Sequence, residues 1–118
     1  MYNKISIITP CYNEQEVIEE TYKRLKKVLI SLSSLASEII FVNDGSNDRT
    51  AEILQQLSEK DSCVKLISFS KNFGHQAAVT AGINYCTSDL AVIIDADLQD
   101  PPEVIPDMIK TLQENQAN

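Results

Sequence analysis

Short apolar runs alternate with longer segments of helical periodicity along the 118-residue chain. The apolar runs cover residues 4–10, 38–44, 64–69 and 90–95, and polar turn sequences follow each of them. Apolar residues at helical spacing recur at 17–32, after Asn47 and Asp48, at 77–85 and at 104–112. This alternation predicts an α/β fold, a parallel sheet with helices on both faces.

Right-handed crossovers restrict such a sheet to a few strand orders. We expect a Rossmann-like, three-layer α/β/α arrangement with strand order 3-2-1-4, in which the chain reverses direction between the first and fourth strands. Ligands bind beyond the carboxyl ends of the strands at such a point. The polar sequences "TPCYNE", "NDGSN" and "DADLQD" should therefore meet at one rim of the sheet.

The last strand and the last helix carry more detailed expectations. Residues 90–95 do not alternate apolar with polar, which predicts a strand covered on both faces. Asp100 is expected to be the N-cap of the next helix, with Pro101 at its first position and Glu103 completing a capping box.

Composition excludes several classes of protein. A net charge of −7 argues against a nucleic-acid binder, which would show a basic face. Three widely spaced cysteines without a CxxC pair argue against a zinc site and indicate a reducing, cytoplasmic setting. The longest uncharged run, residues 28–37, is too short to span a bilayer.

Asp95 and Asp97 are the strongest candidates for chemistry. They lie two residues apart, so in an extended segment both side chains point to the same side. Two adjacent carboxylates repel unless they share a cation or a proton. Mg²⁺ and Mn²⁺ favour such oxygen ligands, and Gln99 adds a neutral oxygen. The alternative is that these residues only cap the strand and the next helix, which is the expected role of Asp100.

Other candidates follow the remaining strands. Asp44 could accept hydrogen bonds from a base or a ribose, or could instead form an Asx-turn before Gly45. Tyr12 and Glu14 could hold a base, although Glu14 could equally stabilise the first turn of the following helix. Lys71 could contact a phosphate or a base, or could equally remain solvated.

The single histidine and the missing motifs narrow the chemistry further. His75 is expected to pack within its loop rather than to act in catalysis. GxGxxG, GxxxxGK[ST] and GxSxG sequences are absent, which excludes a dinucleotide fingerprint, a P-loop and a hydrolase nucleophile elbow.

Four segments, in order and spacing, resemble family 2 glycosyltransferases of the GT-A fold. They are "IITPCYNEQEVI", "IIFVNDGSNDRT", "FSKNFGHQAAVTAGI" and "VIIDADLQDPPEVI". The similarity extends over residues 4–110 and is greatest to the branch of dolichyl-phosphate mannosyltransferase and the bactoprenol (undecaprenyl-phosphate) glucosyltransferases.

The resemblance implies a UDP- or GDP-sugar donor and a divalent cation, Mg²⁺ or Mn²⁺. Matched position by position, it assigns base and ribose binding to Pro10, Tyr12, Glu14 and Asp44. It assigns the metal and the diphosphate to Asp95, Asp97 and Gln99, and makes Asp95 and Asp97 the catalytic pair.

The family's catalytic domain is much longer than this chain, which implies that residues 1–118 form its donor-binding half. The acceptor site, expected to take a polyprenyl phosphate, and any membrane helices would be missing, so the chain alone is expected to be inactive. The full protein is expected at the cytoplasmic face of the membrane. The open sheet edge beside residues 90–95 predicts a homo-oligomer.

Three alternatives remain open at this point. The first is a transferase acting on saccharide hydroxyls of a surface polysaccharide. The second is a nucleotide-binding module without catalysis. The third is a receiver-like phosphoacceptor domain, which shares the length, the parallel sheet and an acidic magnesium pocket. Against the receiver, the first strand ends in "TPCYNE" rather than in an acidic pair.

Overall fold

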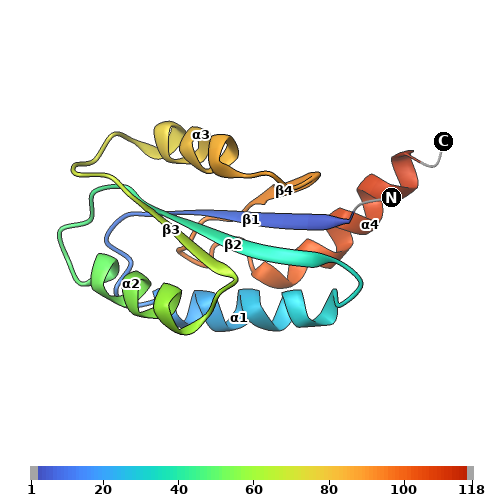
Figure 1. The fold of residues 1–118 in the computed structure, drawn as a ribbon, viewed down its shortest axis with the longest axis horizontal. Coiled ribbons are helices and arrows are strands. Elements are labelled where there is room, and N and C mark those ends of the chain that lie inside the picture. The colour runs from blue at the N-terminus through green and yellow to red at the C-terminus, as the bar shows by residue number, and fades with distance from the viewer. Residues whose placement is uncertain (1–2, 117–118) are drawn as a thin grey trace.

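The computed structural model describes residues 3–116, and within them the four strands form one parallel sheet (Figure 1). The strands are β1 (Lys4–Cys11), β2 (Ala36–Asn43), β3 (Val64–Ser68) and β4 (Leu90–Ile93). Their order is β3-β2-β1-β4, which confirms the predicted order. The register pairs Ile7 with Ile39 and with Val92, so β1 lies in the middle of the sheet and β4 at an edge.

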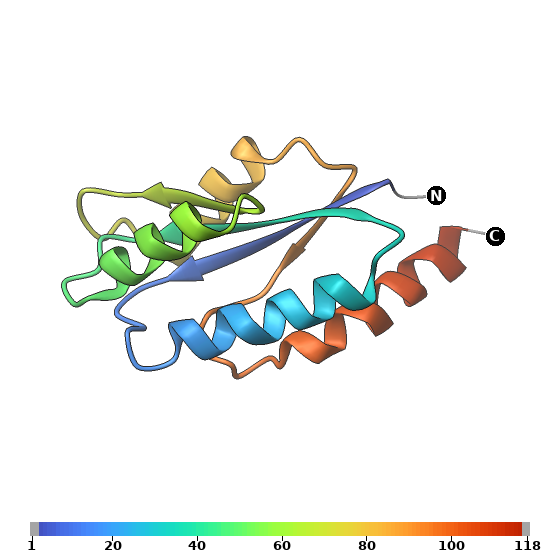
Figure 2. The same ribbon diagram turned by 60° about the horizontal axis from the view of Figure 1, so that its bottom comes forward.

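The helices cover the two faces of the sheet unequally (Figures 1 and 2). They are α1 (Ile18–Ser31), α2 (Thr50–Lys60), α3 (His75–Tyr85) and α4 (Ile105–Gln116), with a short 3₁₀ turn, η1 (Pro102–Val104), before α4. The larger core lies between the sheet and α1, α2 and α4. Among the described residues, only α3 packs on the opposite face, where Ala78 meets Ile8, Ile40 and Val42. The arrangement is the expected three-layer fold.

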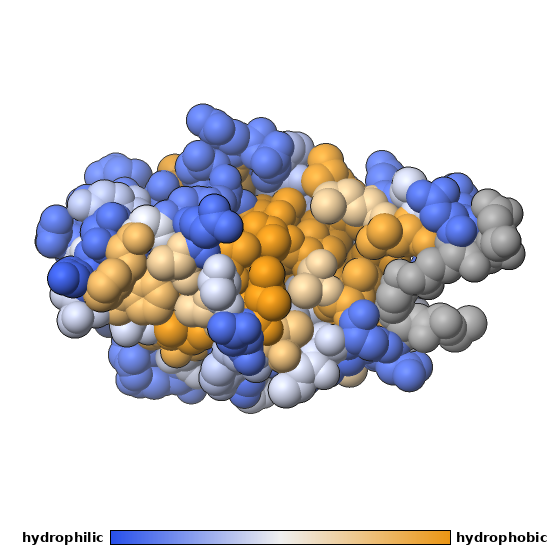
Figure 3. All heavy atoms as spheres, turned by 90° about the horizontal axis from the view of Figure 1, so that it is seen from above, coloured by the Kyte–Doolittle hydropathy of each residue, from blue (hydrophilic) through white to orange (hydrophobic). Residues whose placement is uncertain are grey.

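The edge strand β4 is buried on one face only. Leu90 and Val92 belong to the larger core, whereas Ala91 and Ile93 are exposed. The expectation that this strand is covered on both faces is therefore wrong, because α3 packs over β1 and β2 and leaves β4 open. Figure 3, which views the α3 side, shows a broad hydrophobic area there.

The helix starts differ from the sequence-based expectations. Asn47 or Asp48 is expected to cap α2, but Arg49 is the N-cap and no side chain makes a capping hydrogen bond there. Asp48 Oδ1, one position earlier, accepts a hydrogen bond from the Thr50 backbone N–H at 2.9 Å. The capping box expected at Asp100 and Glu103 is absent. Pro101 is extended, with ψ 135°, and α4 begins only at Ile105. Glu103, in η1, instead forms a salt bridge with Arg24 of α1, so its carboxylate ties η1 to α1.

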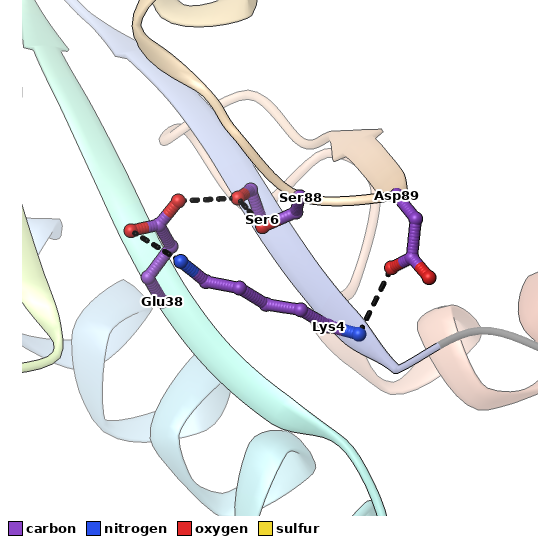
Figure 4. Close-up of polar contacts among 5 residues, drawn as sticks. All are labelled: Lys4, Ser6, Glu38, Ser88 and Asp89. Atoms are coloured by element: carbon purple, nitrogen blue, oxygen red, sulfur yellow. Dashed lines mark hydrogen bonds and ion pairs between the residues drawn. The ribbon is translucent and has the colours of Figure 1, made fainter.

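A polar cluster surrounds the beginning of β4, at the end of the sheet remote from the predicted site (Figure 4). The nearly buried Glu38 carboxylate accepts a hydrogen bond from the Ser6 hydroxyl at 2.5 Å, and the Ser6 and Ser88 hydroxyl oxygens lie 2.6 Å apart. Asp89 accepts the Lys4 backbone N–H at 2.9 Å. These contacts fix the start of β4 against β1 and β2.

Candidate functional site

A pocket lies beyond the carboxyl ends of β1, β2 and β4, where the sequence predicts the site. Three segments of the chain and the turn after β2 line it. The lining residues are Pro10, Cys11, Tyr12, Glu14, Asp44, Asn72, Gly74, His75, Asp95, Ala96 and Asp97. The parallel sheet causes this convergence, because all four strands end at the same rim.

Most of the predicted residues line the pocket, and two do not. Pro10, Tyr12, Glu14, Asp44, Asp95 and Asp97 are among the lining residues, whereas Lys71 and Gln99 are absent from them. The Lys71 ammonium lies 5.2 Å from the centre of the Phe73 ring, a cation–π arrangement. The Gln99 backbone N–H donates to Asp97 Oδ1 at 3.1 Å. Lys71 and Gln99 thus lie beside the pocket rather than in its wall.

Asp44 joins the end of β2 to the loop before α3. Its side chain is nearly buried, and its two carboxylate oxygens accept the Phe73 N–H at 2.7 Å and the Gly74 N–H at 3.0 Å. The Asn72 side-chain amide adds a longer bond of 3.3 Å. The Asp44 side chain does not form the Asx-turn considered for it, since both of its oxygens accept from the loop before α3. The Asn43 side-chain oxygen accepts the Ser46 N–H, three residues on, at 3.1 Å. Asp44 therefore shapes the wall of the pocket.

The same two segments approach each other closely at Gly45. Its φ of 69° lies in the left-handed region that favours glycine. A β-carbon at this position would lie 2.2 Å from the Lys71 carbonyl carbon and 2.4 Å from the Asn72 nitrogen. Only glycine allows the turn after β2 to pass this close to the loop after β3.

His75 belongs to the pocket, contrary to the expectation of a loop-packing role. It is the first residue of α3, its side chain is 63% exposed, and its Nε2 lies 2.7 Å from Asp95 Oδ1. Sequence reasoning placed Asn72 on this rim without giving it a role, and it missed Cys11, Gly74 and Ala96 as lining residues. The sequence position of this loop could have indicated its role, because the loop follows the third strand and so begins at the same rim as the other polar clusters.

The pocket is strongly acidic. Burial, followed by the charges of Asp97, Asp48 and Asp95, raises the pKa of the Glu14 carboxyl. Burial and the charges of Glu14 and Asp95 raise the pKa of the Cys11 thiol well above its ordinary value. Converging carboxylates of this kind favour a cation.

Within residues 3–116, however, no group of three or more His, Cys, Asp or Glu side chains is placed to hold a metal ion alone. A cation in this pocket would need further oxygen ligands from a bound phosphate or from water, which is how Mg²⁺ usually binds. The donor set, two carboxylates and a nearby amide, fits that requirement. Across the same residues, no helix combines the length and apolar character needed to cross a bilayer.

Known proteins similar to this chain are glycosyltransferases. The chain is 54% identical over 109 residues to the uncharacterized glycosyltransferase YkcC of Bacillus subtilis, covering 92% of this chain and 33% of that protein. It is 44% identical over 110 residues to the prophage bactoprenol glucosyl transferase homolog of Escherichia coli, covering 93% of this chain and 36% of that protein. The chain thus spans about a third of the length of these relatives.

The fold is also that of a solved glycosyltransferase structure. The mannosyltransferase PcManGT from Pyrobaculum calidifontis, solved in complex with GDP-Man and Mn²⁺, superposes with a TM-score of 0.72 at 23% identity. The match covers 82% of this chain and 28% of that one, and it confirms the GT-A fold. The model of the family described as glycosyl transferase family 2 matches residues 6–118. The chain therefore belongs to glycosyl transferase family 2.

Proposed function

We propose that these 118 residues supply the donor site of a glycosyltransferase that moves a sugar from a UDP- or GDP-sugar to a polyprenyl phosphate. The observation that supports this most directly is the convergence of Glu14, Asp44, Asp95 and Asp97 on one pocket at the switch point of a parallel sheet. The names of the relatives favour a bactoprenol-type acceptor, and the GDP-Man complex of the structural neighbour favours a nucleotide-sugar donor.

The end of β1 and Asp44 would bind the nucleoside. The Tyr12 side chain is 42% exposed beside buried Pro10, so its ring can stack on a base. Glu14 offers a hydrogen-bond acceptor for a base or a ribose hydroxyl. Asp44 already accepts bonds from Phe73 and Gly74, and a carboxylate has about four acceptor sites, so it can accept a ligand hydroxyl as well.

Asp95, Asp97 and Gln99 would hold Mg²⁺ or Mn²⁺ together with the diphosphate. The bound cation would neutralise charge on the leaving nucleoside diphosphate. His75 would orient Asp95 through Oδ1 and leave Oδ2 for the ion, since only Oδ1 lies at hydrogen-bond distance from the imidazole. Lys71 remains a candidate phosphate contact, which would require it to leave the Phe73 ring.

The acceptor would bind a part of the protein outside this sequence, and the 118 residues alone would not turn over. A polyprenyl phosphate oxygen is already ionised at neutral pH, so the transfer needs no strong general base. The full-length protein would then act at the cytoplasmic face of the membrane, where a lipid-linked phosphate is accessible.

Calorimetric titration with UDP and GDP in the presence of Mn²⁺ tests the donor site. We expect saturable binding of one of the two nucleotides. The nucleotide that binds more tightly identifies the base of the sugar donor. Acetyl phosphate serves as the control, because a receiver-like domain would form an acyl phosphate on an aspartate and this chain should not. Formation of that adduct without nucleotide binding would contradict the proposed function.

We also expect the isolated chain to self-associate through the β4 edge. Within residues 3–116 this strand pairs only with β1, and Ile93 is 42% exposed on the open face, so a second copy can pair with the free backbone and cover the apolar surface. Light scattering should give twice the monomer mass. Ile93→Lys should restore the monomer, and Ile30→Lys, at a 69% exposed position on α1, should not. A monomeric wild type at high concentration would contradict the prediction.

A further inference from the structure

The backbone carbonyl between Asp95 and Asp97 is bonded to a side chain from another layer of the fold. Ala96 is 1% exposed, and its carbonyl oxygen accepts a hydrogen bond from the Thr21 hydroxyl at 2.7 Å. Thr21 is fully buried on α1. One side chain of α1 therefore contacts the peptide that separates the two pocket carboxylates.

The Thr21 hydroxyl has one proton and two candidate acceptors. The Val17 carbonyl lies 3.1 Å away, but it already accepts the Thr21 backbone N–H at 2.9 Å. The Ala96 carbonyl is closer, and the Thr21 hydroxyl is the partner found for it among the described residues. A buried carbonyl without a partner is costly, so the proton is better used at Ala96.

The chain after β4 needs such an anchor because it leaves the sheet at once and turns sharply. The last sheet-type bond joins the Ile94 N–H to the Ile8 carbonyl at 3.0 Å. Four residues later, Leu98 has a φ of 64°, a left-handed conformation that is unfavourable for a residue with a β-carbon. Such a conformation persists only where the surroundings enforce it.

The α1 sequence supports a specific role for this hydroxyl. Ile18, Thr21, Leu25 and Val28 form one buried stripe of the helix, and threonine is its only polar member. Valine would fill the same volume without a buried hydroxyl, and it would suit the apolar surroundings better. Threonine is favourable at this position only if its hydroxyl makes a hydrogen bond, and the Ala96 carbonyl is the acceptor.

We infer that Thr21 is a positioning residue that holds the turn from Asp95 to Gln99 so that both carboxylates face the pocket. The polar cluster around Glu38 fixes where β4 begins, and Thr21 fixes how the chain leaves it. The use of this geometry for a cation and a diphosphate rests on the proposed function, but the contact itself does not.

Thr21→Val and Thr21→Ser test the inference, because valine keeps the shape without the hydroxyl and serine keeps the hydroxyl without the methyl group. NMR of the unliganded protein should show a shifted Ala96 carbonyl resonance and loss of the left-handed Leu98 conformation in the valine variant only. Thr111→Val is the matched control, since the Thr111 hydroxyl donates to the Asp107 carbonyl at 3.0 Å on the exposed side of α4.

Nucleotide titration gives the second readout. We expect Thr21→Val to weaken Mn²⁺-dependent binding of UDP or GDP about tenfold, as loss of a buried hydrogen bond would, and Thr21→Ser to restore it. If both variants lost the same amount of nucleotide affinity, in proportion to the fall in their melting temperatures, Thr21 would be a packing residue and the inference would be overturned. Unchanged Ala96 and Leu98 resonances in Thr21→Val would overturn it as well. Failure of wild type to bind either nucleotide would contradict the proposed function alone, because the resonances test the contact without ligand. If Thr21→Val does not fold, Thr21→Ala is compared with Thr21→Ser, because both lack the methyl group and only serine keeps the hydroxyl.

Discussion

Removal of divalent cations with EDTA should abolish measurable binding of UDP and GDP to this chain. The reason is charge. Glu14, Asp95 and Asp97 line the pocket, the chain carries a net charge of −7, and a nucleoside diphosphate adds about three further negative charges. Each close like-charge contact costs about 4 kcal/mol at 4 Å and an effective dielectric constant near 20, before screening by salt. Binding energy from the base and ribose cannot offset several such contacts.

Asp97→Asn should reproduce the effect of EDTA even at high Mn²⁺. The substitution keeps the shape and the acceptor for the Gln99 N–H, but it removes one of the two charges that would hold the ion. Asp100→Asn, at an exposed position beyond the pocket lining, is the control and should bind as wild type does. Titrations of the three proteins with and without EDTA give the answer. Equal wild-type binding in EDTA would exclude the cation-bridged site.

Asp44→Asn should lower the stability of the unliganded protein by about 3 kcal/mol, because hydrogen bonds to a buried charged group contribute about 1.5–3 kcal/mol each. Both Asp44 carboxylate oxygens accept backbone N–H groups, one from Phe73 and one from Gly74. An asparagine side chain has one acceptor oxygen, so its NH₂ group would face a backbone donor.

The corresponding fall in melting temperature is about 10 °C for a domain of this size. Calorimetric melting without nucleotide measures it, and the melting temperature of Asp100→Asn should not change. If Asp44→Asn melted at the wild-type temperature but bound nucleotide more weakly, the prediction would be contradicted. Asp44 would then contact the ligand without organising the loop before α3.

The fold was predictable because each expected strand is an apolar run of the right length between helical segments, and right-handed crossovers then leave few strand orders. The same reasoning placed Asp44, Asp95 and Asp97 at one rim. It failed for features that depend on partners distant in sequence. The salt bridge of Glu103 with Arg24 replaces the expected capping box, and the contact of His75 with Asp95 joins residues twenty positions apart.

The half-covered β4 strand was unpredictable for a related reason. Apolar residues on both sides of a strand show that both faces avoid water, but not which segment covers them. Here α3 is the only helix on its side of the sheet in the described part of the chain, and it packs over β1 and β2. The sequence pattern shows which residues would be more stable when buried. Whether they are buried depends on where the covering helix packs.

The close approach at Gly45 restricts how this protein can diverge. The turn after β2 and the loop before α3 fit each other only while residue 45 lacks a side chain, since a β-carbon there would overlap the Lys71 carbonyl carbon. Insertions or substitutions in one loop would therefore survive in evolution only with compensating changes in the other. For directed evolution of donor preference, the two loops should be randomised together in one library, with position 45 kept as glycine.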